Sequence, residues 1–309
     1  MRIHLDTDLG SDPDDACALA MLLGTPDVEL TGITTTIDPG GVRAGMVHEL
    51  LALAGNRVVP VAAGAEVTLT SRTTPGDIPT GERWWPRPVP SRPSPPGAAF
   101  DLLAASIDAG ATIVAIGPYT NLALLETLRP GALAKAPIVL MGGWVGGRLP
   151  DGYPPWEADR DWNVQCDTHA ARVVFDSAPD LTMVTIAATI QVPVRKADLP
   201  RMQGAGALGR LLAQQARTQG EAHYPDDGRR HERLPDDLLN FHHDPLACAV
   251  ATGWPGAPAT RRRLSAVEEG GVLRFEEDPG GRPVRVVDQV DGEAFRDHWI
   301  RCIERATAA

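Results

Sequence analysis

Short apolar runs alternate with amphipathic stretches along most of the chain. Residues 3–6 and 28–35 have the apolar, β-branched composition of strands, and residues 15–23 between them have that of a helix. Further strands are expected at residues 58–62, 112–116, 138–141 and 181–186, and further helices at residues 44–54, 100–109, 121–128 and 168–176. This alternation predicts an α/β fold with an open, mostly parallel central sheet and helices on both of its faces.

The last fifth of the chain has a different pattern. Short strands are expected at residues 262–267, 272–275 and 284–287, followed by a helix at residues 292–305. An amphipathic helix at residues 208–217 and another that begins near Asp244 precede them. We therefore predict a single domain over residues 1–309 that ends in a small C-terminal β-rich appendage.

Two polar segments interrupt the regular pattern and are candidates for mobile loops near a site. Residues 66–97 are rich in Pro, Gly and Thr and contain Trp84 and Trp85, so they form either a lid or a surface connection whose tryptophans pack inward. Residues 220–235 form the second polar segment, and Tyr224 and Arg229 within it are candidates for closing over a ligand.

Charge and cysteine content exclude several classes of partner. A formal net charge of -11 argues against nucleic-acid binding, which needs clustered Lys and Arg. The four cysteines are widely spaced and lack CxxC spacing: Cys17, Cys166, Cys248 and Cys302. We expect them to be free thiols and not to form disulfides or bind zinc. No apolar run is long enough to span a membrane and the first strand begins at once, so we expect a cytoplasmic protein.

Polar clusters follow several of the expected strands. They lie at residues 6–15, 34–38, 117–121 and 142–144. In an open parallel sheet, ligands bind beyond the carboxyl ends of the strands, so these clusters are expected to meet at one edge.

The densest cluster has five aspartates among the ten residues from Asp6 to Asp15. A hard cation would relieve their repulsion, and an oxygen-only ligand set favours Ca²⁺ or Mg²⁺ over zinc or copper. One of Asp12 and Asp14 is expected simply to cap the helix that follows. An EF-hand is excluded because Ser11 and Cys17 stand where its Gly and Glu are required.

A haloacid-dehalogenase-type phosphatase is the rival enzyme class, because it also places Asp-x-Asp after its first strand. Gly10 stands where such enzymes carry Thr or Val, and Lys135 and Lys196 are the lysines available for a phosphate contact. A divalent-metal phosphohydrolase of this type is therefore the second candidate for the enzyme class.

A set of motifs resembles the nucleoside hydrolase family over residues 2–249. The motifs are Asp6-Thr7-Asp8-Leu9-Gly10 with Asp14-Asp15-Ala16, Thr34-Thr35 with Asp38-Pro39-Gly40-Gly41, Gly117-Pro118-Tyr119-Thr120-Asn121-Leu122, Met141-Gly142-Gly143, Asp161-Trp162-Asn163 and His243-Asp244-Pro245. Their order along the chain matches that of the family.

The resemblance implies Ca²⁺-dependent hydrolysis of the N-glycosidic bond of a ribonucleoside. It makes Asp8 the general base and a metal ligand, Asp15 and Asp244 further ligands, and Thr120 a ligand through its backbone carbonyl. It places Asp14 and Asn163 at the ribose 2′- and 3′-hydroxyls, Asp161 at the 5′-hydroxyl, Asp38 on the ribose side, and His243 beside the leaving base. Homodimers or homotetramers are common among such enzymes.

The chemistry of the bond agrees with this implied site. Cleavage develops oxocarbenium character on the sugar and negative charge on the base, which suit carboxylates on one side and a histidine on the other. His242 is the alternative to His243, and the family resemblance favours His243. A non-catalytic calcium- and ribose-binding protein is disfavoured because Asp8, Asp15, Asp244 and Asn163 are all present.

Four features depart from the usual family pattern. The Asp-rich loop is two residues longer, Asp38 stands where many members have Asn, and Asp161 replaces a Glu that reaches the 5′-hydroxyl. The Trp84 region lacks the second leaving-group histidine of pyrimidine-preferring members, so Trp84 or Trp85 is a candidate to stack on the base. The preferred base and the 5′-substituent stay open.

Overall fold

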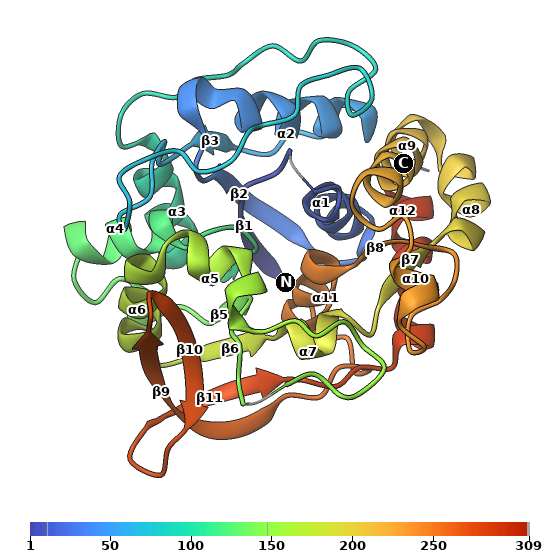
Figure 1. Ribbon diagram of the computed structural model, residues 1–309. Coiled ribbons are helices and arrows are strands. Elements are labelled where there is room, and N and C mark those ends of the chain that lie inside the picture. Colours follow the sequence, from blue (N-terminus) through green and yellow to red (C-terminus); the bar gives the residue numbers. More distant parts are fainter. Residues whose placement is uncertain (11, 147, 308–309) are drawn as a thin grey trace.

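The computed structural model describes residues 1–10, 12–146 and 148–307. A sheet of nine strands runs through the molecule, and Figure 1 shows its course. The strand order is β10-β9-β11-β6-β5-β4-β1-β2-β3. These strands are β1 (Arg2–Thr7), β2 (Glu29–Thr35), β3 (Val61–Ala63), β4 (Thr112–Ala115), β5 (Ile138–Met141), β6 (Leu181–Val184), β9 (Thr260–Glu269), β10 (Val272–Glu277) and β11 (Arg282–Val287). The strands from β3 through β6 to β11 pair in parallel, which confirms the predicted fold class.

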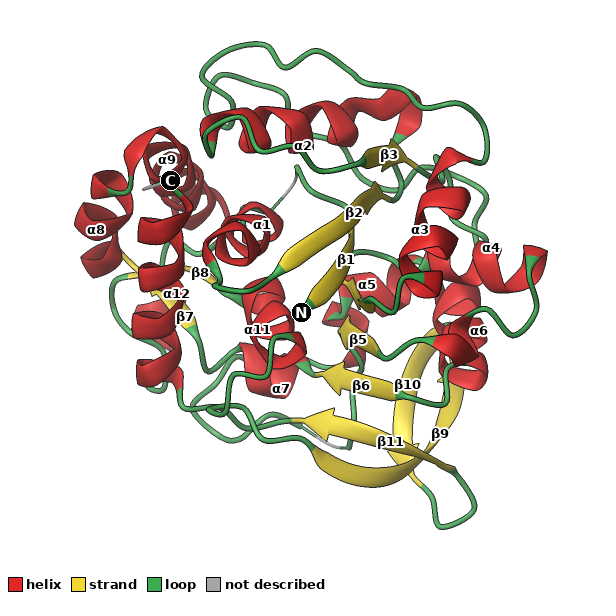
Figure 2. Cartoon of the chain, turned by 180° about the vertical axis from the view of Figure 1, so that it is seen from behind, coloured by secondary structure: helices red, strands yellow, loops and turns green. Residues whose placement is uncertain are grey.

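Helices cover both faces of the sheet. The longer ones are α1 (Asp14–Gly24), α2 (Val42–Leu53), α3 (Ala98–Asp108), α4 (Thr120–Leu128), α6 (Thr168–Ser177), α9 (Gly206–His223), α11 (His243–Ala251) and α12 (Gly292–Ala306). Figure 2 shows α3, α4 and α6 gathered on one side of the sheet, and α1, α11 and α12 on the other.

Alternate residues of the central strands supply two separate hydrophobic cores. In β4, Ile113 packs into the core with α3, α4 and α6, whereas Val114 packs into the core with α1, α9, α11 and α12. Ile138 and Val139 divide in the same way in β5. Because strand side chains point alternately to opposite faces, an entirely apolar strand is what a sheet covered on both faces requires.

The C-terminal strands extend the central sheet. β9 pairs antiparallel with β10 and β11, and β11 joins β6 in parallel through Arg285 to Val287. The expected β-rich appendage is therefore an antiparallel margin of the same sheet. Its position beside β6 depends on a pairing between segments about a hundred residues apart, which local sequence does not specify.

Several short elements were not expected from the sequence. They are α5 (Trp162–Cys166), α7 (Ile186–Thr189), α8 (Leu199–Gly204), α10 (Asp227–Arg230) and the antiparallel strands β7 (Pro193–Arg195) and β8 (Leu238–Phe241), together with the 3₁₀ turns Pro39–Gly41, Leu133–Lys135, Ala158–Arg160 and Lys196–Asp198. The polar segment 220–235 is consequently more ordered in secondary structure than predicted, because it contains the end of α9 and all of α10.

The segment between β3 and α3 crosses over α2 and reaches α9 (Figure 1). At Gly45 of α2 an added Cβ would lie 2.1 Å from the carbonyl oxygen of Pro90, so the absence of a side chain lets the segment lie directly on the helix. Amide side chains of α9 donate to its backbone: Gln214 to the carbonyls of Glu82 and Arg83, and Gln215 to that of Trp84. These contacts attach the segment to the helix that carries Tyr224 at its end.

In the part of the chain that the structure describes, no helix combines the length and the apolar character needed to cross a bilayer. Cys17, Cys248 and Cys302 are buried free thiols, and Cys166 is a half-buried one.

Candidate active site

A cavity of about 380 Å³ opens at the carboxyl ends of the parallel strands. Asp8 follows β1, Ile116 follows β4, Met141 ends β5 and Ile186 follows β6, and all four line the cavity. The predicted site residues that line it are Asp8, Asp14, Asp15, Asp161, Asn163, Tyr224, His243 and Asp244. The strand ends thus converge where the topology of a parallel sheet places a ligand.

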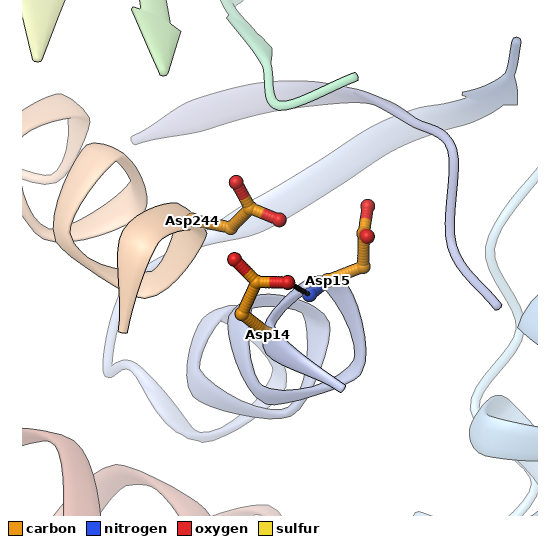
Figure 3. Close-up of side chains that lie close together, drawn as sticks. All are labelled: Asp14, Asp15 and Asp244. Atoms are coloured by element: carbon orange, nitrogen blue, oxygen red, sulfur yellow. Dashed lines mark hydrogen bonds between the residues drawn. The ribbon is translucent and has the colours of Figure 1, made fainter. Parts of the chain in front are cut away.

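Three buried carboxylates meet at the floor of the cavity (Figure 3). Asp14 and Asp15 are the first two residues of α1, and Asp244 is the second residue of α11. One oxygen from each lies within 4.8 Å of the others, and the Asp15 backbone N–H donates to Asp14 Oδ1 at 3.1 Å. Two helix N-termini therefore point at one place, where their dipoles favour negative charge.

The electrostatics of this cluster fit a cation. Burial, and then repulsion from neighbouring aspartates, raise the pKa of Asp14, Asp15 and Asp244 well above the usual range. A bound cation would stabilise the ionised form of all three, and an all-oxygen set suits Ca²⁺ or Mg²⁺. These residues could hold a metal ion.

Asp8 lies beside this cluster but makes different contacts. Its Oδ2 accepts a hydrogen bond from Trp162 Nε1 at 3.3 Å, and Arg43 Nη1 donates to its backbone carbonyl and to that of Leu9. Burial raises the pKa of Asp8, and the charge of Arg43 partly offsets this. A carboxylate with a raised pKa is better suited to take a proton than an ordinary surface aspartate.

Backbone groups fix the side chains of Asp161 and Asn163 in the same cavity. Asp161 accepts from the N–H groups of Gly143 at 2.6 Å and Val164 at 3.3 Å, and burial raises its pKa to about 6. The amide of Asn163 donates to the carbonyls of Ile116 at 2.9 Å and Met141 at 3.1 Å. With its N–H donors engaged, Asn163 can offer its carbonyl oxygen to a hydroxyl group.

An aromatic wall of Trp156, Tyr224 and His243 is built around the buried ring of Phe241. The ring centroids of these three residues lie 5.8, 5.5 and 5.4 Å from that of Phe241. Thr189 Oγ1 and His243 Nδ1 are 2.7 Å apart, which fixes the imidazole. Burial lowers the pKa of His243 to about 4, so the ring is neutral at pH 7.

His242 is turned away from this wall. It packs against Trp299 with the centroids 4.2 Å apart and does not line the cavity. Of the two neighbouring histidines, His243 is therefore the one that can meet a substrate there.

Three predicted site residues are not among those that line the cavity. Thr120 begins α4, and its hydroxyl donates to Asp167 Oδ2 at 2.7 Å. Trp84 borders a separate small cavity behind the Asp-rich loop. Asp38 is fully buried, and its carboxylate accepts from Thr35 Oγ1 at 2.6 Å and from the N–H groups of Arg43 and Ala44 at 2.7 and 3.0 Å. Asp38 thus caps the beginning of α2.

Replacing Asp38 by alanine is expected to lower the free energy of unfolding by about 1–3 kcal/mol, because two backbone donors of α2 lose their partner in a buried site. We expect kcat/KM of the remaining folded protein to stay within about threefold of the original. Urea unfolding and steady-state kinetics check both values. A large rise in KM without loss of stability would instead place Asp38 against the substrate.

The cavity also contains residues that the sequence did not single out. Trp156, Arg160, Trp162, Gln219 and His223 all line it. Trp162 lies inside the motif Asp161-Trp162-Asn163, so its neighbours offered a signal. The others come from segments whose position relative to the sheet is set by tertiary packing.

Asp12 links the Asp-rich loop to two elements that are distant along the chain. Its carboxylate accepts from Gln219 Nε2 of α9 at 2.9 Å, from Asn240 Nδ2 of β8 at 2.5 Å and from the backbone N–H of Asp14 at 3.2 Å. The loop is therefore joined to the helix that precedes Tyr224 and to the strand that precedes His243.

Known proteins share both the sequence pattern and the fold. The sequence model of the inosine-uridine preferring nucleoside hydrolase family matches residues 3–297. The pyrimidine-specific ribonucleoside hydrolase RihA of Salmonella paratyphi A is 32% identical over 215 residues, which cover 67% of each chain. RihA of Salmonella typhimurium is 31% identical over the same share.

Solved structures agree along the whole chain. A plant nucleoside hydrolase, PpNRh1, superposes with a TM-score of 0.78 at 23% identity, covering 100% of this chain and 99% of its own. A purine-preferring ribonucleoside hydrolase from Gardnerella vaginalis gives 0.76 at 22% identity with 100% of both chains covered. The match over residues 3–297 and the RihA relatives establish that this chain belongs to the inosine-uridine preferring nucleoside hydrolase family, whose members hydrolyse N-glycosyl bonds.

Proposed function

We propose that this enzyme uses Ca²⁺ and water to cleave a ribonucleoside, or a related N-riboside, into ribose and free base. The observation that carries the proposal is the buried group of Asp14, Asp15 and Asp244 in the same cavity as Asp8 and His243. The carboxylates and the aromatic wall with its histidine line the same cavity, and they suit the opposite charges that develop on sugar and base.

The metal would be held by Asp15 and Asp244, with Asp8 and the Thr120 carbonyl as the further ligands that the family resemblance implies. Asp14 belongs to the observed carboxylate group, so it is an additional candidate ligand. Bound Ca²⁺ would orient the attacking water and lower its pKa.

The protein's own groups would perform the remaining steps. Asp8 accepts a proton from the water as that water attacks the anomeric carbon. The bond from the sugar to the base nitrogen breaks, and the base leaves with the bonding electron pair and takes up a proton from solvent. Asp14 and Asn163 accept hydrogen bonds from the 2′- and 3′-hydroxyls, and Asp161 accepts one from the 5′-hydroxyl. These contacts hold the ribose in one orientation relative to Asp8.

His243 assists departure of the base in this proposal. Its pKa of about 4 leaves the ring neutral at pH 7. In the tautomer in which Nδ1 accepts a hydrogen bond from the Thr189 hydroxyl, Nε2 carries the ring hydrogen and donates it to the developing negative charge. A carbonyl or ring nitrogen of the base beside the aromatic wall would receive that hydrogen bond.

His243→Ala is expected to lower kcat for natural nucleosides by about a hundredfold or more, because the leaving base loses its donor. p-Nitrophenyl riboside, whose leaving group needs no such help, should lose less than about tenfold. Steady-state kinetics on both substrates measure the difference. Equal losses on the two substrates would assign His243 a structural role, and His242→Ala provides the comparison for a histidine outside the cavity.

The first experiment is release of reducing sugar from purine and pyrimidine ribosides, 2′-deoxyribosides and 5′-modified ribosides, with and without a calcium chelator. Ribose release that the chelator suppresses and Ca²⁺ restores is the expected result. Both base classes are needed, since one relative is named pyrimidine-specific and one structural neighbour purine-preferring. A folded protein that is inactive on every riboside would contradict the proposal.

The phosphatase alternative gains no support from the site. Neither Lys135 nor Lys196 is among the residues that line the cavity in the described part of the chain. A homodimer or homotetramer in the cytoplasm completes the proposal, and light scattering of the purified protein together with cell fractionation tests these two points.

A further inference from the structure

The cavity contains one positively charged residue in an otherwise acidic lining. Among the lining residues that the structure describes, Arg160 is the one lysine or arginine, whereas seven are aspartates. A substrate made only of ribose and a neutral base gives such a cation no charge to bind. Arg160 is exposed, so its guanidinium can meet a ligand that enters from solvent.

Arg160 is held in place by an aromatic ring and not by an acid. Its guanidinium carbon lies 5.4 Å from the ring centroid of Trp156, which is itself packed edge-on against buried Phe241. No carboxylate lies within ion-pair distance of Arg160 in the described residues. A guanidinium that lies over an aromatic ring and has no acidic partner keeps N–H groups that can bind carboxylate or phosphate oxygens in pairs.

The neighbouring residues leave this edge available. Arg160 ends the 3₁₀ turn Ala158–Arg160, and its backbone N–H donates to the Glu157 carbonyl at 3.0 Å. The adjacent Asp161 directs its carboxylate inward to the N–H groups of Gly143 and Val164. The positive charge of Arg160 also opposes the rise in the pKa of Tyr224 that burial and then Asp12 and Asp14 cause.

We infer that Arg160 and Trp156 form an anion-recognising subsite, and that the substrate is a riboside with a negatively charged group beside the aromatic wall. This inference rests on the proposed function and narrows its substrate class. Two sources share the required chemistry, a carboxylate on the base and a phosphate on the ribose C5′. Because the surrounding aspartates repel both, such a group needs a cation to enter the cavity.

The test compares matched probes that differ in one charged group. Uridine is the neutral reference, orotidine adds a carboxylate on the base, and uridine 5′-monophosphate adds a phosphate at C5′. For each probe, kcat/KM and calorimetric affinity are measured for the original protein, Arg160→Gln and Arg160→Lys. Arg233→Gln is the control, because Arg233 stacks on Tyr153 at 5.6 Å but does not line the cavity.

For each charged probe we take the ratio of its kcat/KM, or of its affinity, to that of uridine. We expect Arg160→Gln to lower this ratio about tenfold for one of the two charged probes, with a smaller loss for Arg160→Lys and none for Arg233→Gln. The probe that responds identifies the source of the charge. A ratio that stays within about twofold for both probes would overturn the inference and leave Arg160 as a counter-charge for the aspartates. Calorimetric affinities test the role of Arg160 even if no probe is hydrolysed. The absence of hydrolysis would count against the proposed function and not against the anion-recognising subsite.

Discussion

Asp8→Ala is expected to abolish turnover, and Asp8→Asn to lower kcat by about a thousandfold. Both changes remove the carboxylate that takes a proton from the attacking water. Asparagine retains an oxygen that can accept the hydrogen bond from Trp162 Nε1, so the local geometry is kept while the base is lost. Single-turnover kinetics on the best riboside measure the effect.

Measurements of thermal stability and of Ca²⁺ binding distinguish the role of Asp8 as a base from its role as a metal ligand. Loss of a buried carboxylate with a raised pKa should not lower the melting temperature of the metal-free protein. If Asp8 is a metal ligand as well as the base, Asp8→Asn also weakens Ca²⁺ binding; if it is the base alone, binding is unchanged. Asp77→Asn is the matched control, since Asp77 is an exposed aspartate at the same cavity. Near-normal turnover in folded Asp8→Ala would refute the mechanism.

Ca²⁺ at a hundredfold excess over its dissociation constant is expected to stabilise the protein by about 2.7 kcal/mol, which raises its melting temperature by roughly 5 °C. Asp244→Asn should lose most of this shift. The same variant should be at least as stable as the original protein without metal, because repulsion with Asp14 and Asp15 is relieved. Both effects follow from the close approach of the three carboxylates (Figure 3).

Scanning calorimetry of the metal-free protein, titrated with Ca²⁺ and separately with Mg²⁺, checks these values. A full Ca²⁺ shift in Asp244→Asn would mean that the ion binds elsewhere. An equal response to Mg²⁺ at equal concentration would contradict the choice of Ca²⁺. Asp77→Asn again serves as the control.

The first strand–loop–helix unit was predictable because its signals are local. A buried strand followed by aspartates and an apolar helix is observed at residues 2–24 much as expected. Asp8, Asp14 and Asp15 reach the cavity because a strand end and a helix N-terminus leave little choice of direction. Asp161, Asn163 and Asp244, which the family resemblance singled out, line the same cavity.

Two of the predicted substrate-binding residues, Asp38 and Trp84, do not line the cavity. Asp38 follows a strand end, yet its carboxylate turns back to cap α2, because two free N–H groups lie within reach. Trp84 was a candidate for base stacking, whereas Trp156 and Trp162 line the cavity. The choice among tryptophans depends on how the segment between β3 and α3 packs on α2 and α9.

The parallel sheet, the acidic loop and the edge at which the site forms could be predicted from the sequence, because side-chain periodicity and chain direction are local properties. Tertiary structure alone decided which carboxylates meet and which rings form the wall. Asp244 joins Asp14 and Asp15 because α1 packs against α11, and Trp156, Tyr224 and His243 share a wall because each contacts Phe241. Such contacts join residues distant along the chain, and their free energy exists only after the cores on both faces of the sheet have formed.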